Sequence, residues 1–149
     1  MRILLADSQP KVRFAMRVLL ERQPGLKVMG EAADADDLLN QAEMSCPDIV
    51  LIAWSLPGMA ADGFLPALRG VCPDLSVIVL SGRPELRRAA LDAGADAFVS
   101  KTDPPEYLLM AIEDCGKKSV WHGGERGVSR AESSPRTMSI NGDAWSDLA

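Results

Sequence analysis

The feature that most constrains the fold is an alternation of short apolar runs with longer amphipathic stretches. The apolar runs cover residues 3–6, 27–32, 49–53, 76–80 and 97–100, and about a dozen amphipathic residues separate most neighbouring runs. Most of the runs are apolar throughout rather than at every second position, which is typical of strands buried on both faces. The pattern therefore predicts five βα units and an α/β domain with a parallel sheet.

Helix signals fill the stretches between the runs. The first helix is predicted to begin with Ser8 as its N-cap and Pro10 in its first turn, and to end at Pro24-Gly25. Gly94 is placed to be the left-handed residue after the fourth helix. The remaining helices are predicted over residues 34–45, from near Asp62 to before Pro73, over 84–93, and from Pro104-Pro105 onward.

Length and charge limit the classes of protein. A chain of 149 residues fits one domain of ordinary size. The net charge is −5 and the basic residues are scattered, which argues against nucleic-acid binding by this chain. The apolar run at the start is too short for a signal sequence or a membrane span, so we expect a cytoplasmic protein that does not contact membranes.

The composition changes near the end of the chain. From about Gly123 it is rich in Gly, Ser, Arg, Glu and Pro, with few apolar anchors. We therefore expect a folded domain over residues 1–120, followed over residues 121–149 by a flexible tail or truncated linker.

The three cysteines show no metal-binding or redox motif. Cys46, Cys72 and Cys115 lie far apart in the sequence, without a C-x-x-C pair, and His122 is the single histidine. The expectation is three reduced, structural thiols and no bound metal.

Polar residues gather where the predicted strands end. Asp7 and Ser8 follow the first strand, Ala53 ends the third, Ser81 follows the fourth and Lys101 follows the fifth. In an open parallel sheet, ligands bind at the carboxyl ends of the strands, near the point where the strand order reverses. We expect an acid, a hydroxyl and an ammonium group to converge on one crevice at that edge.

Five segments of the chain together resemble the receiver domains of bacterial response regulators, over about residues 1–118. The resemblance implies a flavodoxin-like, doubly wound (βα)5 fold, as in CheY-like proteins, with a five-stranded parallel sheet in the order 2-1-3-4-5. The final segment is similar to the subfamily that usually carries a LuxR-type DNA-binding domain. The segments that carry the resemblance are residues 3–10, 48–59, 77–81, 90–101 and 103–109.

The resemblance also assigns a role to each polar position. In the family, an acceptor aspartate takes the phosphoryl group, two further acids hold Mg²⁺, and a hydroxyl and a lysine bind the phosphoryl oxygens. This chain keeps Asp7, Ser81 and Lys101 at matching positions. It departs from the pattern at Ser8, which replaces the second metal-binding acid, and at Ala53, which replaces the acceptor.

The two departures predict a loss of chemistry. Mg²⁺ depends on charged oxygen ligands, so one carboxylate in place of three should make its binding very weak or absent. An alanine methyl cannot act as a nucleophile. We therefore expect no cofactor and no enzymatic activity, and we expect Lys101 to pair with Asp7, with Ser8 or Ser81 as further acceptors.

Three other residues could in principle replace the acceptor. Asp48 begins the third strand and should lie at the opposite edge of the sheet, out of reach. Asp62 is better explained as a helix N-cap. Ser8 would need a general base, and Asp7 is the one candidate beside it. The resemblance places Phe98 at the family's switch-aromatic position, although a core phenylalanine on the edge strand is the plainer interpretation.

Three functions remain open. The leading hypothesis is an atypical receiver in two-component, phosphorelay-type signalling that acts by phosphorylation-independent binding to a protein partner or to itself. The contact would use the fourth and fifth helices, where arginines 83, 87 and 88 oppose Glu106 and Asp114, or the first and fifth.

The second possibility is the receiver part of a LuxR-type transcriptional regulator whose DNA-binding domain is absent from this chain. No helix-turn-helix pattern follows Gly123. The third is a small-molecule-binding flavodoxin-like domain, which the fold alone would allow. A Gly-rich phosphate loop is missing after the first strand, which weighs against this third possibility.

Overall fold

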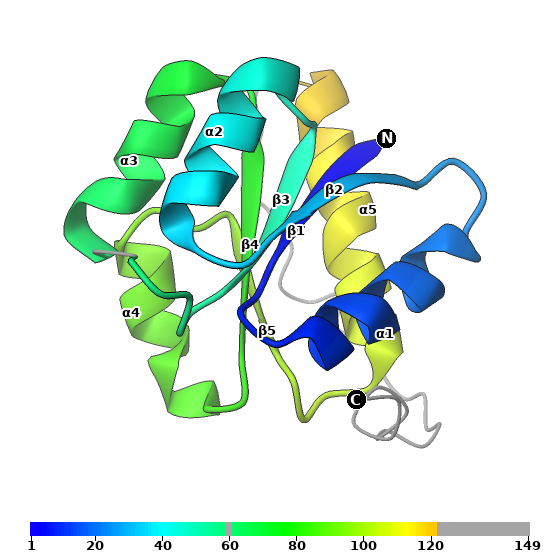
Figure 1. Cartoon of the computed structure of the whole chain (residues 1–149). Helices are drawn as coiled ribbons and strands as arrows, with labels where there is room; N and C mark the ends of the chain where they lie inside the picture. Colours follow the sequence, from blue (N-terminus) through cyan, green and yellow to red (C-terminus); the bar gives the residue numbers. More distant parts are fainter. Residues whose placement is uncertain (59–60, 122–149) are drawn as a thin grey trace.

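The chain folds into a three-layer α/β/α domain around a parallel sheet in the order β2-β1-β3-β4-β5 (Figure 1). The computed structural model describes residues 1–58 and 61–121, and the side chains of 61–62 and 117–121 lie outside the description. The elements are β1 (Arg2–Ala6), α1 (Pro10–Glu21), β2 (Lys27–Ala32), α2 (Ala35–Ser45), β3 (Ile49–Ala53), α3 (Ala61–Val71), β4 (Ser76–Ser81), the 3₁₀ turn η1 (Pro84–Leu86), α4 (Arg87–Asp92), β5 (Ala97–Ser100) and α5 (Pro105–Trp121).

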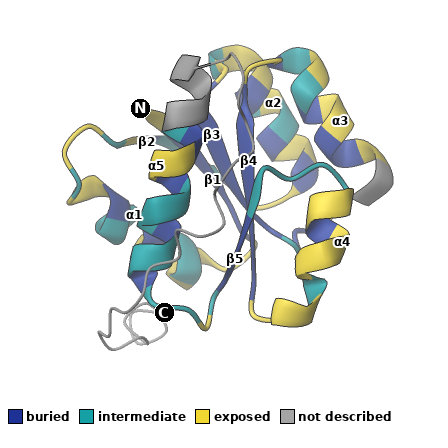
Figure 2. Ribbon diagram, turned by 180° about the vertical axis from the view of Figure 1, so that it is seen from behind, coloured by how far each residue is buried: buried dark blue, intermediate teal, exposed yellow. Residues whose placement is uncertain are grey.

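Two apolar clusters lie on the two faces of the sheet. One contains side chains of α2, α3 and α4, and the other contains side chains of α1 and α5. All described residues of β3 and β4 are buried, whereas the outward faces of the helices are exposed (Figure 2). The observed sheet confirms the predicted fold class and strand order. Helices lie on both sides because strands that are buried on both faces need to be covered on both.

The helix ends agree with the sequence signals, with two exceptions. Gly94 follows α4 with φ +116°, as predicted for a residue in the left-handed region. The predicted single helix over 84–93 instead begins as the 3₁₀ turn η1 and continues as α4. The predicted N-cap Ser8 is wrong: Gln9 is the N-cap of α1, and no side chain caps it.

The expectation of three reduced thiols is also wrong. Cys46 and Cys72 form a disulfide, with their Cα atoms 5.5 Å apart, a separation usual for such bonds. The two residues are 26 positions apart in the sequence. They meet because β3 and β4 are parallel neighbours, so the segments that lead into those strands lie side by side. Cys115 is buried among the apolar residues between the sheet and α5.

Residues 122–149 lie outside the described residues, so the predicted tail and the boundary at residue 120 stay predictions. In the part of the chain that the structure describes, α5 continues to Trp121. No helix there combines the length and the apolar character that crossing a bilayer demands.

Candidate functional site

The strand register brings the predicted polar positions to one edge of the sheet. Ala6 of β1 pairs with Ile52 of β3, so Asp7 and Ala53 each follow a paired residue by one position. Ser81 of β4 pairs with Ser100 of β5, and Lys101 comes next along the chain. The carboxyl ends of four adjacent strands therefore carry Asp7, Ala53, Ser81 and Lys101.

Asp7 and Lys101 form an ion pair across this edge. The Lys101 Nζ donates to Asp7 Oδ2 at 2.9 Å, although β3 and β4 lie between the strands that precede the two residues. The Asp7 side chain is 3% exposed and that of Lys101 is 27% exposed. The pairing predicted from the sequence is confirmed, and it leaves the buried carboxylate neutralised.

The second Asp7 oxygen holds the start of α1. Oδ1 accepts the backbone N–H of Gln9 at 2.9 Å, a local turn that aspartates commonly form. Gln9, rather than Ser8, takes the N-cap position of α1. Ser8 is exposed. Both oxygens of the Asp7 carboxylate are thus in use.

Ala53 is buried at the end of β3, with 2% of its surface exposed. The next amide, of Trp54, donates to the carbonyl of Leu80 in β4, which keeps the strand end in register. A methyl group at this position offers no atom that could accept a phosphoryl group or ligate a cation. The position is therefore chemically inert, although it lies between Asp7 and Lys101 in the strand order.

Ser81 has a structural role. Its Oγ accepts the backbone N–H of Arg83 at 3.1 Å, so it stabilises the turn that leads into η1. The carbonyl of the same residue accepts the amide of Lys101 at 2.8 Å, which fixes the backbone from which the lysine extends. The alternative expectation, that Ser81 accepts directly from the Lys101 amine, has no support among the described hydrogen bonds.

Phe98 is buried in the cluster on the α2, α3 and α4 side of the sheet, with 5% of its surface exposed. The Arg87 guanidinium of α4 lies 5.2 Å from the centre of its ring, within the range of a cation–π contact. The phenylalanine therefore packs as a core residue, and Arg87 covers it from the solvent side. No pattern in the sequence predicts this contact between Arg87 and Phe98.

Sequence reasoning also missed a basic and acidic network beside Asp7. Arg13 of α1 donates to the carbonyl of Asp7, and its Nε donates to Glu31 Oε1 at 3.0 Å. Arg17 Nε donates to Glu31 Oε2 at 2.8 Å. Burial raises the pKa of Glu31, but hydrogen bonds and charges from Arg17 and Arg13 outweigh it, so the pKa is lowered from 4.5. The spacing of Arg13 and Arg17, one helical turn apart, is the signal that could have found it.

The other acids that were considered lie elsewhere. Asp48 is at the opposite edge, as predicted, where its Oδ2 accepts the backbone N–H of Arg2 at 2.7 Å. Asp62 lies inside α3, which begins at Ala61, so the prediction that it caps this helix is wrong; its side chain lies outside the described residues.

The donor set at this edge does not fit Mg²⁺. Asp7 offers a carboxylate that already binds an ammonium group and a backbone amide, and Ser8 offers an exposed hydroxyl. Throughout residues 1–58 and 61–121, no three His, Cys, Asp or Glu side chains gather in a way that could hold a metal ion. Mg²⁺ prefers several charged oxygens in octahedral geometry, and the described residues do not provide them.

Comparison with known proteins gives a consistent result. Residues 3–113 match the model of the response regulator receiver domain family. The nitrate/nitrite response regulator protein NarP of Escherichia coli is 34% identical over 119 residues, which are 78% of this chain and 55% of NarP. The chain spans about half the length of the curated relatives it matches first.

Two solved structures are similar as well. A LuxR-family two-component response regulator from Aurantimonas sp. SI85-9A1 is 33% identical, with a TM-score of 0.70, and the match covers 76% of this chain and 82% of that one. The receiver domain of the response regulator NarL from Mycobacterium tuberculosis is 27% identical, also with a TM-score of 0.70, over 78% of this chain and 95% of that one.

Proposed function

This chain belongs to the response regulator receiver domain family, and we propose that it signals through protein contacts without being phosphorylated. The observation that carries the proposal is the buried Ala53 methyl, at the position that the resemblance matches to the family's acceptor. Nucleophilic attack on a phosphoryl group needs an oxygen, nitrogen or sulfur atom, and a methyl group has none.

The ion pair between Asp7 and Lys101 supports the same proposal. In a phosphorylated receiver, the lysine binds the phosphoryl oxygens and the acids hold Mg²⁺. Here the Lys101 Nζ lies 2.9 Å from Asp7 Oδ2, so an incoming phosphoryl group would have to compete with a buried carboxylate. The proposal therefore includes no Mg²⁺ cofactor and no enzymatic activity of the chain itself.

Signals would then arrive by binding. A receiver that exists in two conformations responds to any partner that binds one of them more tightly. In this proposal the partner is a protein or a second copy of the chain, and it contacts α4 and α5 or α1 and α5. The contact would take place in the cytoplasm, without nucleic acid or membrane bound by this chain.

A direct test is incubation with acetyl phosphate and Mg²⁺ followed by intact mass spectrometry. We expect the wild-type chain to gain no phosphoryl group. The double variant Ser8→Asp with Ala53→Asp should gain one, because it restores the acceptor and the second metal-binding acid. Ser8→Asp alone is the matched control and should gain none.

A phosphoryl group on the wild-type chain would overturn the proposal, and peptide mapping would then show whether Asp62 or Ser8 had accepted it. Failure of the double variant, with the wild type also unmodified, would contradict the assignment of Ala53 to the acceptor position. Circular dichroism of each variant verifies that it is folded.

A second function is favoured by the lengths of the relatives. The chain covers 55% of NarP and 53% of the probable transcriptional regulatory protein SgaR of Hyphomicrobium methylovorum. This coverage supports the proposal that the chain is the receiver part of a LuxR-type transcriptional regulator. The DNA-binding domain of that regulator would lie outside this chain. Sequencing the surrounding gene would distinguish the two: an adjoining helix-turn-helix region in the same reading frame would favour the regulator.

A further inference from the structure

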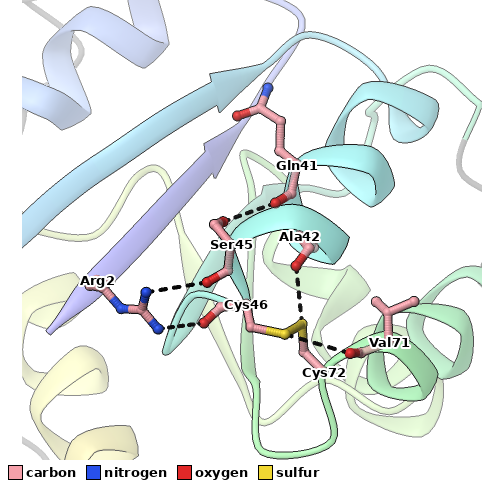
Figure 3. Close-up of a disulfide and its surroundings, with 7 residues drawn as sticks. All are labelled: Arg2, Gln41, Ala42, Ser45, Cys46, Val71 and Cys72. Atoms are coloured by element: carbon pink, nitrogen blue, oxygen red, sulfur yellow. Dashed lines mark hydrogen bonds between the residues drawn. A yellow bond between two sulfur atoms is a disulfide. The ribbon is translucent and has the colours of Figure 1, made fainter.

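We propose that Cys46 and Cys72 form a reversible, solvent-accessible redox switch at the edge of the sheet opposite the Asp7–Lys101 pair. The inference is independent of the proposed function, because it uses none of the residues at the carboxyl ends of the strands. Cys46 is the C-cap of α2, and Cys72 directly follows α3. Their disulfide connects the C-terminal ends of α2 and α3, two of the helices that cover one face of the sheet (Figure 3).

A repeated tripeptide leads into the two strands. Cys46-Pro47-Asp48 precedes β3, and Cys72-Pro73-Asp74 lies just before β4. Because β3 and β4 are parallel and pair from Ile49 with Ser76 onward, the two tripeptides arrive at the same edge. The pairing of the cysteines is therefore a consequence of the strand topology.

The backbone around both cysteines is held by bonds that do not depend on the disulfide. Arg2 Nη2 donates to the carbonyl of Cys46 at 2.7 Å, and Arg2 Nη1 donates to that of Ser45 at 3.2 Å (Figure 3). The amide of Cys72 donates to the carbonyl of Leu68 at 3.0 Å. Two thiols held in place in this way would meet again after reduction, because little chain entropy would be lost when the bond re-forms.

The two cysteine residues differ in exposure. Cys46 is exposed, whereas Cys72 is 3% exposed. A small oxidant or thiol can thus approach the pair from the Cys46 side, and Cys72 is placed to react in the second step. Exposed disulfides are the ones that commonly exchange with thiols in solution, whereas buried ones resist reduction.

The reduced state also has hydrogen-bond acceptors in place. The Cys72 Sγ lies 3.2 Å from the carbonyl oxygen of Ala42, and the Cys46 Sγ lies 3.5 Å from that of Val71 (Figure 3). A disulfide sulfur has no hydrogen to donate, but each thiol produced by reduction could donate to its carbonyl. Reduction therefore leaves no buried S–H without an acceptor, and both redox states fit the same fold.

Local strain indicates what the switch would change. Among the residues that the structure describes, Cys46 is the non-glycine residue with a positive φ, 41° with ψ 73°. Such a conformation persists only when its surroundings hold it. The disulfide is one of those restraints, so reduction should loosen the end of α2 and its contact with α3.

The chemistry balances with a peroxide as oxidant. The Cys46 thiolate attacks hydrogen peroxide, so that an S–O bond forms, the O–O bond breaks and hydroxide leaves. The Cys72 thiolate then attacks the Cys46 sulfur, the S–S bond forms and a second hydroxide leaves. The two thiol protons convert both hydroxides to water. In the reverse direction, two glutathione molecules reduce the disulfide and become glutathione disulfide.

The test follows the number of alkylatable thiols in the full chain. The protein is first reduced, and the reductant is removed in the absence of oxygen. It is then treated with one equivalent of hydrogen peroxide and denatured in the presence of N-ethylmaleimide. Intact mass spectrometry gives the number of alkylated cysteines. We expect two of the three cysteines to lose reactivity, and millimolar glutathione added to the folded protein to restore both. Peptide mapping of the wild type should locate the bond between Cys46 and Cys72.

Two variants provide matched controls. Cys46→Ser should keep both remaining thiols reactive after peroxide, whereas Cys115→Ala should lose both. Three reactive thiols in the peroxide-treated wild type would overturn the inference, because the pair would not form. A pair that glutathione reduces only after denaturation would also overturn it, because the bond would be a permanent structural link.

Hydrogen exchange then measures the consequence of the switch. We expect faster exchange in the reduced protein over residues 42–46 and 68–72, and unchanged exchange in the central strand β3. Equal exchange rates in both redox states would show that the bond switches nothing and would reject the inference.

Discussion

At the residue scale, Lys101 is the cationic partner of the buried Asp7 carboxylate. Lys101 extends over the ends of two strands to reach Asp7, and the pair neutralises a carboxylate that is 3% exposed. A buried charge without a partner lowers the stability of a fold, so the charged partner of Asp7 contributes to the free energy of unfolding. The polar residues at this edge can therefore be retained for stability alone.

Replacing the lysine tests that view. Lys101→Met should lower the free energy of unfolding by about 3 kcal/mol at pH 7, because it leaves the Asp7 carboxylate buried without a cation. Urea denaturation gives the value, and Lys11→Met is the control, since Lys11 is exposed. Adding Asp7→Asn to the Lys101→Met variant should recover part of the loss. Equal stability of the Lys101→Met and Lys11→Met variants would contradict the structural role of the pair.

Glu31 predicts a dependence of stability on pH. Its pKa is lowered from 4.5: burial raises it, and the hydrogen bonds and charges of Arg17 and Arg13 lower it by more. A group whose pKa is lower in the folded state stabilises the fold above its unfolded pKa, and that contribution is lost as the pH falls through the folded pKa. Glu31 should therefore stabilise the protein at pH 7 and contribute little in strong acid.

The corresponding variant is Glu31→Gln. We expect it to lower stability by about 1 kcal/mol at pH 7, and the difference from wild type should shrink as the pH falls below 4.5. Thermal unfolding followed by circular dichroism across this range gives the measurement. Glu21→Gln removes only an exposed pair with Arg17 and serves as the control. A difference that grows toward acid would refute the sign of the effect.

At the element scale, α2 shows local signals that agree with the packing. Asp34 is the N-cap of α2, and its side chain accepts the amide of Asp37 at 2.9 Å. Asp36 and Asp37 also place negative charge in the first turn, where the helix dipole favours it. The helix α2 therefore begins where the sequence supplies both a capping side chain and negative charge for the first turn.

The cap has a measurable effect. Asp34→Ala should destabilise the protein by about 1 kcal/mol, because the first turn of α2 loses a hydrogen-bond acceptor. Asp36→Ala removes the same charge from the same turn without removing the cap, so its effect should be a few tenths of a kcal/mol. Chemical denaturation of the two variants side by side isolates the hydrogen bond. Equal losses would mean that charge alone explains α2.

At the scale of the whole molecule, the exposed apolar residues indicate where partners could bind. Phe14 of α1 is 60% exposed and Leu91 of α4 is 39% exposed. Burying a large apolar side chain is worth about 1.5 to 3 kcal/mol, so one such residue can decide whether a weak contact forms. The two residues lie on the two alternative contact faces of the proposed function.

We expect self-association through the face that includes α1, because Phe14 is both the larger and the more exposed of the two. Phe14→Asp should weaken dimer formation by at least about tenfold, whereas Leu91→Asp should leave it unchanged. Light scattering during size-exclusion chromatography over a range of concentrations provides the measurement. A wild-type chain that stays monomeric at every concentration would rule out the homodimer and leave only a different protein as partner.

Much of the fold and the site could be read from the sequence. Apolar runs without alternation indicated strands covered on both faces, and the residues just after those runs had to lie at one edge because parallel strands share a direction. The Asp7–Lys101 pair followed from the cost of burying either charge alone. Gly94 followed from the left-handed conformation that ends a helix.

Contacts between segments distant in sequence could not be read in the same way. The position of Arg87 over the Phe98 ring depends on how α4 lies against β5. The disulfide is the clearest case, because cysteines 26 residues apart become neighbours only when β3 and β4 pair.

The sequence by itself thus determined the parallel α/β fold, the edge at which polar residues gather and the absence of a nucleophile at position 53. Those properties depend on periodicity and on side-chain chemistry, which are local. Only the tertiary structure decided which oxygen of Asp7 binds which donor, and that Cys46 meets Cys72. Those properties depend on distances across the sheet, which exist only after the strands have paired.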